Sequence, residues 1–387
     1  MKNLETLIQE LCPDGVEFVK LGDCCSFKRG TTITAKNAIP GDVPVLAGGQ
    51  KPAYYHNEAN RTGETIVVAG SGAYAGFVSY WTIPVFLSDS FSVEPDDRLV
   101  VKFVYYFSKN IQQKIFATKK GSGVPHVHGS SIEKFEIPLP PIEVQTEIVR
   151  ILDKFTSLEA ELEAELDCRK RQYEYYRDKL LSFENVGGQE VKWKKMSEVC
   201  KNICSGGTPL TSKAEYYDGN IPWLRTQEVD YCEIHSTLRN ITQLGLDNSS
   251  AKMIPANCVI VAMYGSTAAK VAINKIPLCT NQACCNLEID EDKALVRYVY
   301  QWICKQYEVL KAMGEGSQHN INAQKVKDFK IPIPSLEEQH RIVSILDRFE
   351  SLTTSLQSGL PAEIVARRQQ YEHYRDKLLT FKRKGAA

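Results

Sequence analysis

The chain has 387 residues, 43% of them hydrophobic and 24% charged, which exceeds one ordinary core and predicts two domains. Lys plus Arg equals Asp plus Glu at 47 each, so bulk charge excludes a strongly basic DNA-binding protein, and any DNA contact must come from local patches or basic partners. No apolar run is long enough to span a bilayer, and residues 1–15 lack a signal-peptide core. We expect a cytoplasmic protein without membrane contact.

The 12 cysteines do not have the spacing of a zinc site, which usually needs close pairs such as C-x₂-C with a second pair at a workable distance. We therefore expect no metal site, and we interpret the cysteines as buried, reduced thiols of a cytosolic protein.

In chain order, residues 1–140 predict a first α/β domain with a small, curved sheet. The run 65–69 is typical of a buried strand and 100–110 of a helix. The glycines that follow at 70, 72 and 76 lack the spacing of a dinucleotide-binding loop, and no P-loop lysine follows them. We interpret them as turn residues and expect no nucleotide site.

Residues 141–184 form the first copy of an internal repeat. Residues 137–158 and 331–352 are identical at 13 of 22 positions, and residues 169–183 and 367–381 at 11 of 15. The two matches have shifts of 194 and 198, so the second copy carries four extra residues. The chain therefore alternates variable domains with constant blocks.

Each constant block predicts a long helix. Alternating prolines open both blocks, Pro141 suits a first helical position, and Ser335 with Glu338 fits a capping box. Apolar residues then recur in heptads, with a four-residue stutter in the first block and a longer jump in the second. Gly359 and Pro361 lie in that jump and predict a kink or a restart. The predicted seam consists of Ile148, Phe155, Leu162, Tyr173, Tyr176, Leu180, Ile342, Phe349, Leu356, Tyr371, Tyr374 and Leu378.

An apolar seam of this kind is not stable when it is exposed to water, so it must be covered in one of two arrangements. Each helix packs on its own domain, or the two helices pack on each other, antiparallel if the halves are related by a pseudo-twofold axis. We favour the second. Residues 185–334 predict a second α/β domain, with a strand expected at 258–262 and a helix at 293–313. Residues 335–383 predict the second spacer helix.

Polar or basic residues in glycine-rich loops are the candidate DNA contacts, because Arg, Lys, Gln and Asn read guanine and adenine edges. Each loop alone is weak support, since polar glycine-rich loops occur on any surface. The candidates in the two domains are Lys28, Arg29, Gln50, Lys51, Lys119, His126, Thr208, Arg225, Gln227, Gln282, Gln318, His319 and Asn320.

The repeated I-P-x-P entry, the R-x-x-Q-Y-E-x-Y-R-D-K-L-L-x-F exit and the break at 359–364 closely resemble the specificity subunits of type I restriction-modification systems. The resemblance is strong in the constant blocks and loose in the variable domains. It implies two target-recognition domains, each reading one half of a bipartite double-stranded DNA site, with the unread spacer set by the helices.

The same resemblance implies partners. Two modification subunits, docked on the constant blocks, bring S-adenosylmethionine and methylate adenine, and restriction subunits add ATP- and magnesium-dependent translocation and cleavage. This chain would then carry no cofactor and no catalytic residue. Consistently, it lacks an adenine-methylase D/N-P-P-Y/F tetrapeptide. Two alternatives remain: a methylase or fused endonuclease, which needs a cofactor loop, and a coiled-coil scaffold, which has no need of two diverged domains.

Overall fold

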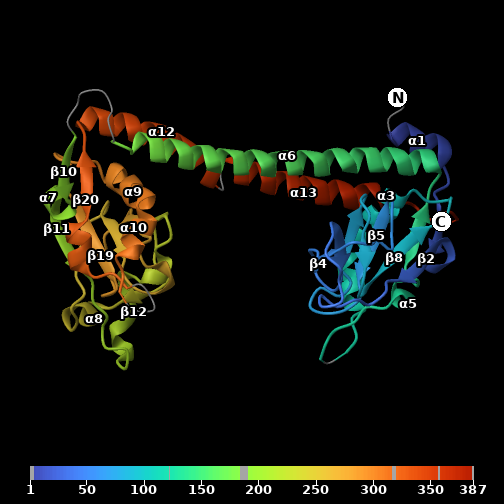
Figure 1. Ribbon diagram of the computed structural model, residues 1–387, viewed down its shortest axis with the longest axis horizontal. Coiled ribbons are helices and arrows are strands. Elements are labelled where there is room, and N and C mark those ends of the chain that lie inside the picture. The colour runs from blue at the N-terminus through green and yellow to red at the C-terminus, as the bar shows by residue number, and fades with distance from the viewer. Residues whose placement is uncertain (1–3, 122, 184–190, 316–319, 356–357, 386–387) are drawn as a thin grey trace. The chain divides into compact units, whose positions relative to one another are not determined.

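The computed structural model describes residues 4–121, 123–183, 191–315, 320–355 and 358–385 (Figure 1). The chain divides into two compact units: unit 1 comprises residues 1–164 and 362–387, and unit 2 comprises residues 165–361. Each unit therefore contains a variable domain and parts of both constant blocks. Among the described residues, no helix combines the length and hydropathy needed to cross a membrane.

Unit 1 is a mixed α and β domain with one helix from each constant block. Its strands form a four-stranded antiparallel sheet in the order β2-β8-β5-β6, a three-stranded sheet β4-β3-β7, and the pair β1-β9. Its elements are α1 (Leu4–Leu11), β1 (Glu17–Lys20), α2 (Leu21–Cys24), β2 (Cys25–Arg29), β3 (Val43–Leu46), β4 (Tyr54–His56), β5 (Thr65–Ala69), β6 (Val78–Trp81), β7 (Phe86–Leu87), β8 (Ser90–Pro95), α3 (Val101–Asn110), α4 (Gln112–Ala117), α5 (Gly129–Ile132), β9 (Glu136–Leu139), the first part of α6 (Ile142–Leu180) and most of α13 (Leu360–Leu378).

Unit 2 repeats this plan with a larger sheet. Its strands form a five-stranded sheet β11-β19-β16-β17-β13, a four-stranded sheet β14-β12-β18-β15, and the pair β10-β20. Its elements, besides the last part of α6, are β10 (Lys192–Lys195), α7 (Met196–Val199), β11 (Cys200–Ser205), η1 (Ala214–Tyr216), β12 (Tyr217–Leu224), η2 (Thr226–Glu228), β13 (Cys232–Ile234), β14 (Asn240–Ile241), α8 (Gln243–Asp247), β15 (Met253–Ile254), β16 (Val259–Ala262), η3 (Gly265–Thr267), β17 (Val271–Asn274), β18 (Leu278–Thr280), β19 (Cys284–Ile289), α9 (Val296–Lys305), α10 (Tyr307–Ala312), α11 (Ala323–Asp328), β20 (Lys330–Ile333) and α12 (Leu336–Thr354).

The sequence-based prediction of the elements is confirmed in most places. The strand expected at 65–69 is β5, and the one expected at 258–262 is β16. The helix expected at 293–313 is divided into α9 and α10, because the chain leaves helical geometry at Gln306. Ser335 caps α12 by accepting a hydrogen bond from the amide of Glu338, while the Glu338 side chain pairs with Arg341 (2.7 Å).

The second constant block is broken as predicted. α12 ends at Thr354 and α13 begins at Leu360, so the helix restarts at the glycine and proline of the jump. The first block, in contrast, is one helix of 39 residues despite its stutter. Leu356, a predicted seam residue, lies outside the described residues.

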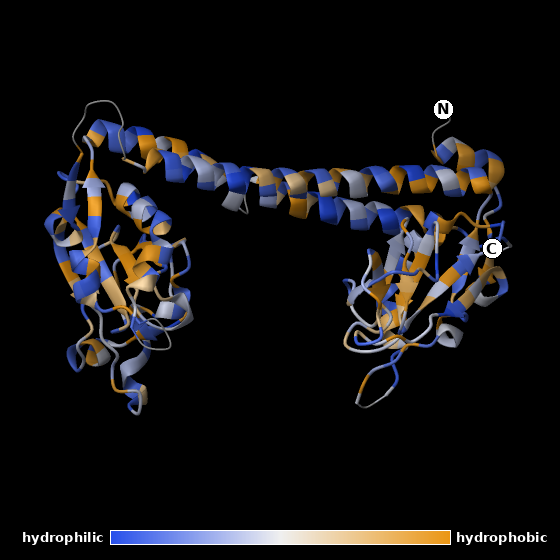
Figure 2. Cartoon of the chain, in the orientation of Figure 1, coloured by the Kyte–Doolittle hydropathy of each residue, from blue (hydrophilic) through white to orange (hydrophobic). Residues whose placement is uncertain are grey.

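The helices pair with each other inside each unit, and they also pack on the domains. In unit 1, the rings of Phe155 and Tyr374 stack with centroids 5.4 Å apart, and Arg368 of α13 forms ion pairs with Glu159 and Glu163 of α6. Contacts farther along α6 are therefore made with earlier residues of α13, which is an antiparallel pairing. Figure 2 shows hydrophobic and polar residues mixed along both helices.

In unit 2, α6 pairs with α12 in the same way. Tyr176 stacks on Phe349 with centroids 5.4 Å apart, and Tyr173 donates a hydrogen bond to Gln301 of α9 (2.7 Å). The two arrangements left open by the sequence are thus combined: the start of each helix packs on its own domain, and the remainder pairs with the other block.

A buried glutamine fixes the start of each helix to its domain. Gln145 is fully buried, accepts a hydrogen bond from the amide of Val100 (2.8 Å), and donates to the carbonyls of Arg98 (2.9 Å) and Pro140 (2.8 Å). Gln339 makes the equivalent bonds in unit 2, to Leu295, Lys293 and Pro334.

An ion pair follows about two turns later in each helix. Lys102 of α3 pairs with Asp153 of α6 (2.7 Å) in unit 1. In unit 2, Arg297 of α9 pairs with Asp347 and Glu350 of α12, both at 2.6 Å. Burial alone would lower the pKa of Arg297, but hydrogen bonds and attraction from the two carboxylates raise it, so the charge is retained.

At two glycines the backbone passes so close to a carbonyl oxygen of another strand that no side chain would fit. A Cβ at Gly30 would lie 2.1 Å from the carbonyl oxygen of Leu87, and one at Gly206 would lie 2.0 Å from that of Thr280. Gly30 follows β2 and Gly206 follows β11, so the same close approach is built into both domains.

Eight of the twelve cysteines are buried, as the sequence analysis expected, and four are partly buried. Burial raises the pKa of the Cys258 and Cys285 thiols to about 12, which keeps them protonated and unreactive at neutral pH.

Replacing Gln145 tests the anchoring of α6. Gln145→Leu removes three hydrogen bonds to backbone groups, and each unpaired buried group costs roughly 1–3 kcal/mol. We expect the free energy of unfolding, measured by urea denaturation with circular dichroism, to fall by more than about 2 kcal/mol. Thr146→Ala, at the neighbouring exposed position, should change it by less than about 0.5 kcal/mol. Equal effects of the two variants would contradict the anchoring role.

Replacing Gly30 tests the close approach. Gly30→Ala places a methyl group against the Leu87 carbonyl, and the backbone must move, so we expect a loss of about 1–3 kcal/mol in unfolding free energy. Gly49→Ala is the matched control, because its Cβ would meet nothing nearer than 3.4 Å. A Gly30→Ala variant as stable as Gly49→Ala would show that the strand can shift without cost.

Candidate nucleic-acid interface

Two parallel strands set the position of the candidate loops in unit 1. Leu46 of β3 lies opposite Leu87 of β7, so both strands end at the same edge of their sheet. The amide of Ser88, just after β7, donates to the carbonyl of Leu46 (2.9 Å). The loops that follow β3 and β7 are therefore neighbours.

The longer sheet ends at this edge too. Arg29, the last residue of β2, lies opposite Phe91, and Ala69, the last of β5, lies opposite Ser90. The hairpin that carries His126 joins them, since the amide of Val127 donates to the carbonyl of Gly70 (2.9 Å). We call the surface made by residues 29–31, 47–51, 70–73, 88–89 and 119–121 with 123–128 the unit 1 loop edge.

Unit 2 assembles its loops by the same contacts. Leu224 of β12 lies opposite Thr280 of β18, again parallel, and the amide of Asn281 donates to the carbonyl of Leu224 (2.9 Å). Thr267 donates to the carbonyl of Thr226 (2.8 Å), which holds η3 against η2. Residues 205–208, 225–228, 263–268, 281–283 and 320 make up the unit 2 loop edge.

Most of the predicted contact residues of unit 1 lie on its loop edge. Gln50 and Lys51 are exposed in the loop after β3. Lys119 donates to the carbonyl of Ala73 (3.1 Å), and His126 is paired by its backbone to Lys120. The structure thus brings together residues almost a hundred positions apart in the chain.

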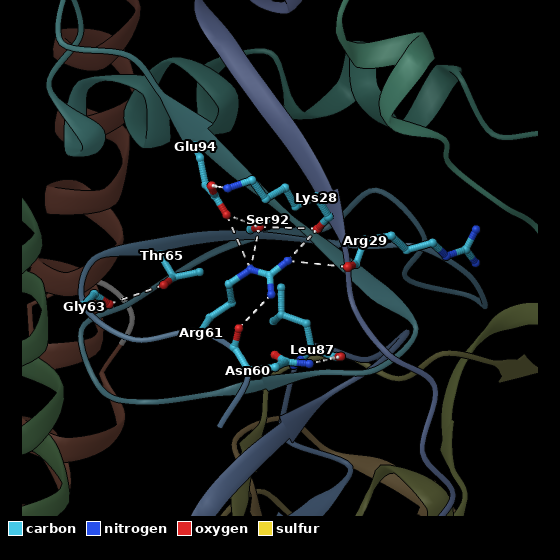
Figure 3. Close-up of polar contacts among 9 residues, drawn as sticks. All are labelled: Lys28, Arg29, Asn60, Arg61, Gly63, Thr65, Leu87, Ser92 and Glu94. Carbon is cyan, nitrogen blue, oxygen red and sulfur yellow. Dashed lines mark hydrogen bonds and ion pairs between the residues drawn. The ribbon is translucent and has the colours of Figure 1, made fainter. Parts of the chain in front are cut away.

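Lys28 and Arg29 differ, because successive strand residues point to opposite faces. Lys28 forms an ion pair with Glu94 and lies beside the Arg61 network of Figure 3, whereas Arg29 extends away from it. Burial alone would raise the pKa of Glu94, but hydrogen bonds from Lys28 and Ser92 hold it below the ordinary value. Arg29 instead approaches Asp89, at 3.4 Å, with 70% of its side chain exposed.

Arg61, which the sequence analysis did not select, is a structural residue of this region. It donates to Ser92 Oγ (2.9 Å) and to the backbone carbonyls of Asn60 (2.7 Å) and Lys28 (3.2 Å), as Figure 3 shows. Asn60 in turn bonds both backbone groups of Leu87, at 2.7 and 2.8 Å. These bonds fix the end of β2 relative to β7 and β8.

The predicted residues of unit 2 that the structure describes also lie on one edge. Thr208 donates a hydrogen bond to Gln282, and Gln227 is exposed in η2. Asn320 accepts a bond from the amide of Gly265 (3.4 Å). Gln318 and His319 lie outside the described residues.

Arg225 has an unusual environment within this edge. Its Nε is buried and has no hydrogen-bond partner among the described residues, and it lies 3.9 Å from Glu228. Glu228 is held in place by the amides of Arg225 (3.1 Å) and Leu238 (2.7 Å). A fixed carboxylate thus lies beside a guanidinium that is 30% exposed.

The carboxylates of both edges were missed by sequence reasoning. Asp89 accepts hydrogen bonds from Ser71 and Arg29, and Glu228 supports Arg225. The search for basic and amide side chains passed over acids, although Asp89 follows β7 and Glu228 lies in η2 after β12. They offset the local basic charge, in keeping with the neutral total.

The predicted seam residues divide between the helix pairs and the domain cores. Phe155 stacks on Tyr374, and Tyr176 stacks on Phe349, across the helix pairs. Ile148 and Ile342 are instead fully buried in the two domain cores, and four others pack against the same cores: Tyr371, Leu378, Tyr173 and Leu180. Among the described residues, no group of three His, Cys, Asp or Glu side chains is arranged to hold a metal ion.

A family model described as type I restriction modification DNA specificity domain matches residues 13–167 and 189–366. The chain is 35% identical to the EcoR124I/EcoR124II specificity subunit of Escherichia coli, covering 98% of this chain and 97% of that one. It is 28% identical to a putative type I restriction enzyme specificity subunit of Haemophilus influenzae, covering 98% and 100%.

Solved structures agree in fold. The S subunit of a type I restriction-modification system from M. genitalium matches with a TM-score of 0.61 at 18% identity, covering 94% of this chain and 96% of that one. The HsdS subunit from Thermoanaerobacter tengcongensis matches with a TM-score of 0.51 at 17% identity, covering 95% and 96%. The match of both halves to the family model and the 35% identity over the whole chain decide the assignment: the protein belongs to the DNA specificity subunits of type I restriction-modification systems.

Proposed function

We propose that each loop edge reads one half of a bipartite site in double-stranded DNA. The supporting observation is that one framework of strand-end contacts occurs twice and carries different polar side chains each time. In unit 1 the edge presents Arg29, Gln50 and Lys51, and in unit 2 it presents Arg225 and Gln227. Two edges of different composition are suited to two different half-sites.

The paired helices would dock two modification subunits and set the unread gap between the half-sites. Aromatic and aliphatic side chains remain exposed on them, notably Tyr175 (60%), Val365 (47%) and Tyr176 (40%). Exposed apolar residues of this kind favour protein–protein contact. Restriction subunits would join through the modification subunits.

In this proposal the chain recognises the DNA sequence and does not catalyse a reaction. S-adenosylmethionine would be carried by the modification subunits, and ATP with magnesium by the restriction subunits. What supports this division is that both halves of the chain match a DNA specificity domain.

Reconstitution tests this division of labour. The chain, S-adenosylmethionine and genomic DNA should give no methylation, while addition of the modification subunits should methylate adenines in two half-motifs separated by an unread gap, as read by methylation-sensitive sequencing. The chain alone should also show no calorimetric binding of S-adenosylmethionine. Methyl transfer by the chain alone would overturn the non-catalytic role, and a continuous motif would overturn the bipartite one.

A four-residue insertion tests the role of the helix in spacing. A further Glu-Ala-Glu-Leu after Leu166 of α6 adds about 6 Å of helix, nearly two base-pair steps of about 3.4 Å. We expect a longer unread gap with both half-motifs unchanged. A variant of the original length, with Glu163 and Glu165 replaced by glutamine, should keep the original gap. An altered half-motif with a constant gap would refute the spacing role.

A further inference from the structure

Each variable domain contains three arginines, and their environments differ sharply. In residues 1–140 these are Arg29, Arg61 and Arg98, and in residues 185–334 they are Arg225, Arg239 and Arg297. An arginine that reads a base must present its planar fork to solvent in the free protein, in a defined orientation. The six guanidinium groups differ in their exposure to solvent and in the partners that hold them.

Two arginines of unit 1 are committed to the fold. Arg61 donates to three backbone carbonyls and to Ser92, and Arg98 pairs with Asp96 (2.7 Å) and donates to the carbonyl of Asp23 (2.8 Å). Arg29 is left as the arginine of the loop edge, 70% exposed and oriented by a carboxylate, Asp89.

In unit 2, Arg297 is bound by Asp347 and Glu350, and Arg239 lies 5.2 Å from the centre of the Tyr217 ring. Arg225 lies on the loop edge with its buried Nε unpaired among the described residues. Because the Nε is buried while 30% of the side chain is exposed, the Arg225 side chain meets solvent through its other atoms.

Both edge arginines have the same kind of support, although they occupy different places in the shared framework. Asp89 is fixed by Ser71, and Glu228 is fixed by two backbone amides, so each guanidinium lies beside a carboxylate that cannot swing away. Arg29 immediately precedes Gly30, whereas the residue before the equivalent Gly206 is Ser205. The two domains thus place their arginine at different points of the edge.

Unit 1 also has a hollow beside its arginine. Arg29 lines a cavity of about 190 Å³ together with Phe27, Ser90, His126 and Glu133. Arg29 and Phe27 share one face of β2, opposite the face that carries Lys28 and Glu94. Arg29 therefore lies at a recess of the loop edge rather than on a flat surface.

On this basis, which rests on the proposed DNA-reading function, we infer that Arg29 and Arg225 are the guanine-reading residues of the two half-sites. Each would donate two parallel hydrogen bonds to O6 and N7 of one guanine in the major groove. Asp89 and Glu228 act as positioning residues that hold each fork in its reading orientation. The half-motifs should therefore each contain a guanine whose recognition depends on one named arginine.

The test compares motifs of variant complexes assembled with the modification subunits. Arg29→Ala should relax one guanine position in the half-motif of unit 1, lowering discrimination there by roughly 5- to 150-fold, and leave the other half-motif unchanged. Arg225→Ala should do the same for the half-motif of unit 2. Arg→Met at either position keeps a side chain of similar length but loses every donor, and it should relax the same guanine position.

Matched controls come from the same domains. Arg98→Ala removes an exposed arginine of unit 1 outside the loop edge, and Arg239→Ala removes an exposed arginine of unit 2; both should leave the motifs unchanged. If Arg29 or Arg225 contacts phosphate instead, the alanine variants will weaken binding to all sequences alike and reduce its salt dependence, with motifs intact, and the inference fails. Absence of any split motif in the unmodified complex would instead be a failure of the proposed function.

Should an alanine variant assemble poorly, the methionine variant decides the matter, because it retains the packing of a long aliphatic side chain. A methionine variant with an unchanged motif overturns the inference. A relaxed guanine position in an assembled complex supports it, and competition binding with duplexes altered at that position alone gives the same ratio independently of methylation.

Discussion

Each unit depends on apolar residues supplied by the other repeat. The core of unit 1 includes Leu379, from the end of the second block, and the core of unit 2 includes Leu181, from the end of the first. At the edge of unit 1, the amide of Val16 donates to the carbonyl of Lys382 (2.9 Å), and that of Lys384 donates to the carbonyl of Val16 (2.9 Å). Neither variable domain completes its core from its own stretch of chain, so each domain needs the other repeat in order to fold. The duplicated blocks must therefore keep their apolar pattern.

That constraint explains part of the identity between the two repeats, namely the identical residues that face inward. Gln145 and Gln339 make the same three backbone bonds, and Asp153 and Asp347 bind a cation of the preceding domain helix. Buried polar groups tolerate little change because an unpaired donor or acceptor is costly. Exposed positions on the same helices carry no such requirement.

The sequence predicted the helices, the break in the second block and the strands at the centre of each sheet, because heptad spacing, proline and buried β-branched runs are local signals. It predicted the first block as one helix, but it could not predict the partner of each part, since Phe155 stacks on Tyr374 and Tyr176 on Phe349 from the other block. The candidate contacts were chosen by residue type, and the strand-end contacts that gather them are long-range. The same limit hid Arg61 and Asp89, whose partners Ser92 and Arg29 lie 31 and 60 positions away in the chain.

Much of the framework of the loop edges consists of backbone contacts, and the side chains of Asn60, Arg61 and Thr267 add to it. The close approaches at Gly30 and Gly206, the bond from Ser88 to Leu46 and the bond from Asn281 to Leu224 involve no variable side chain. Side chains that project from such a framework can be exchanged without loss of the fold, because the groups that hold the loops together are the same for nearly every residue type. A protein that must read new targets while keeping its partners needs this separation: side chains decide what is read, and main chain and buried helix contacts decide where the reading surface lies.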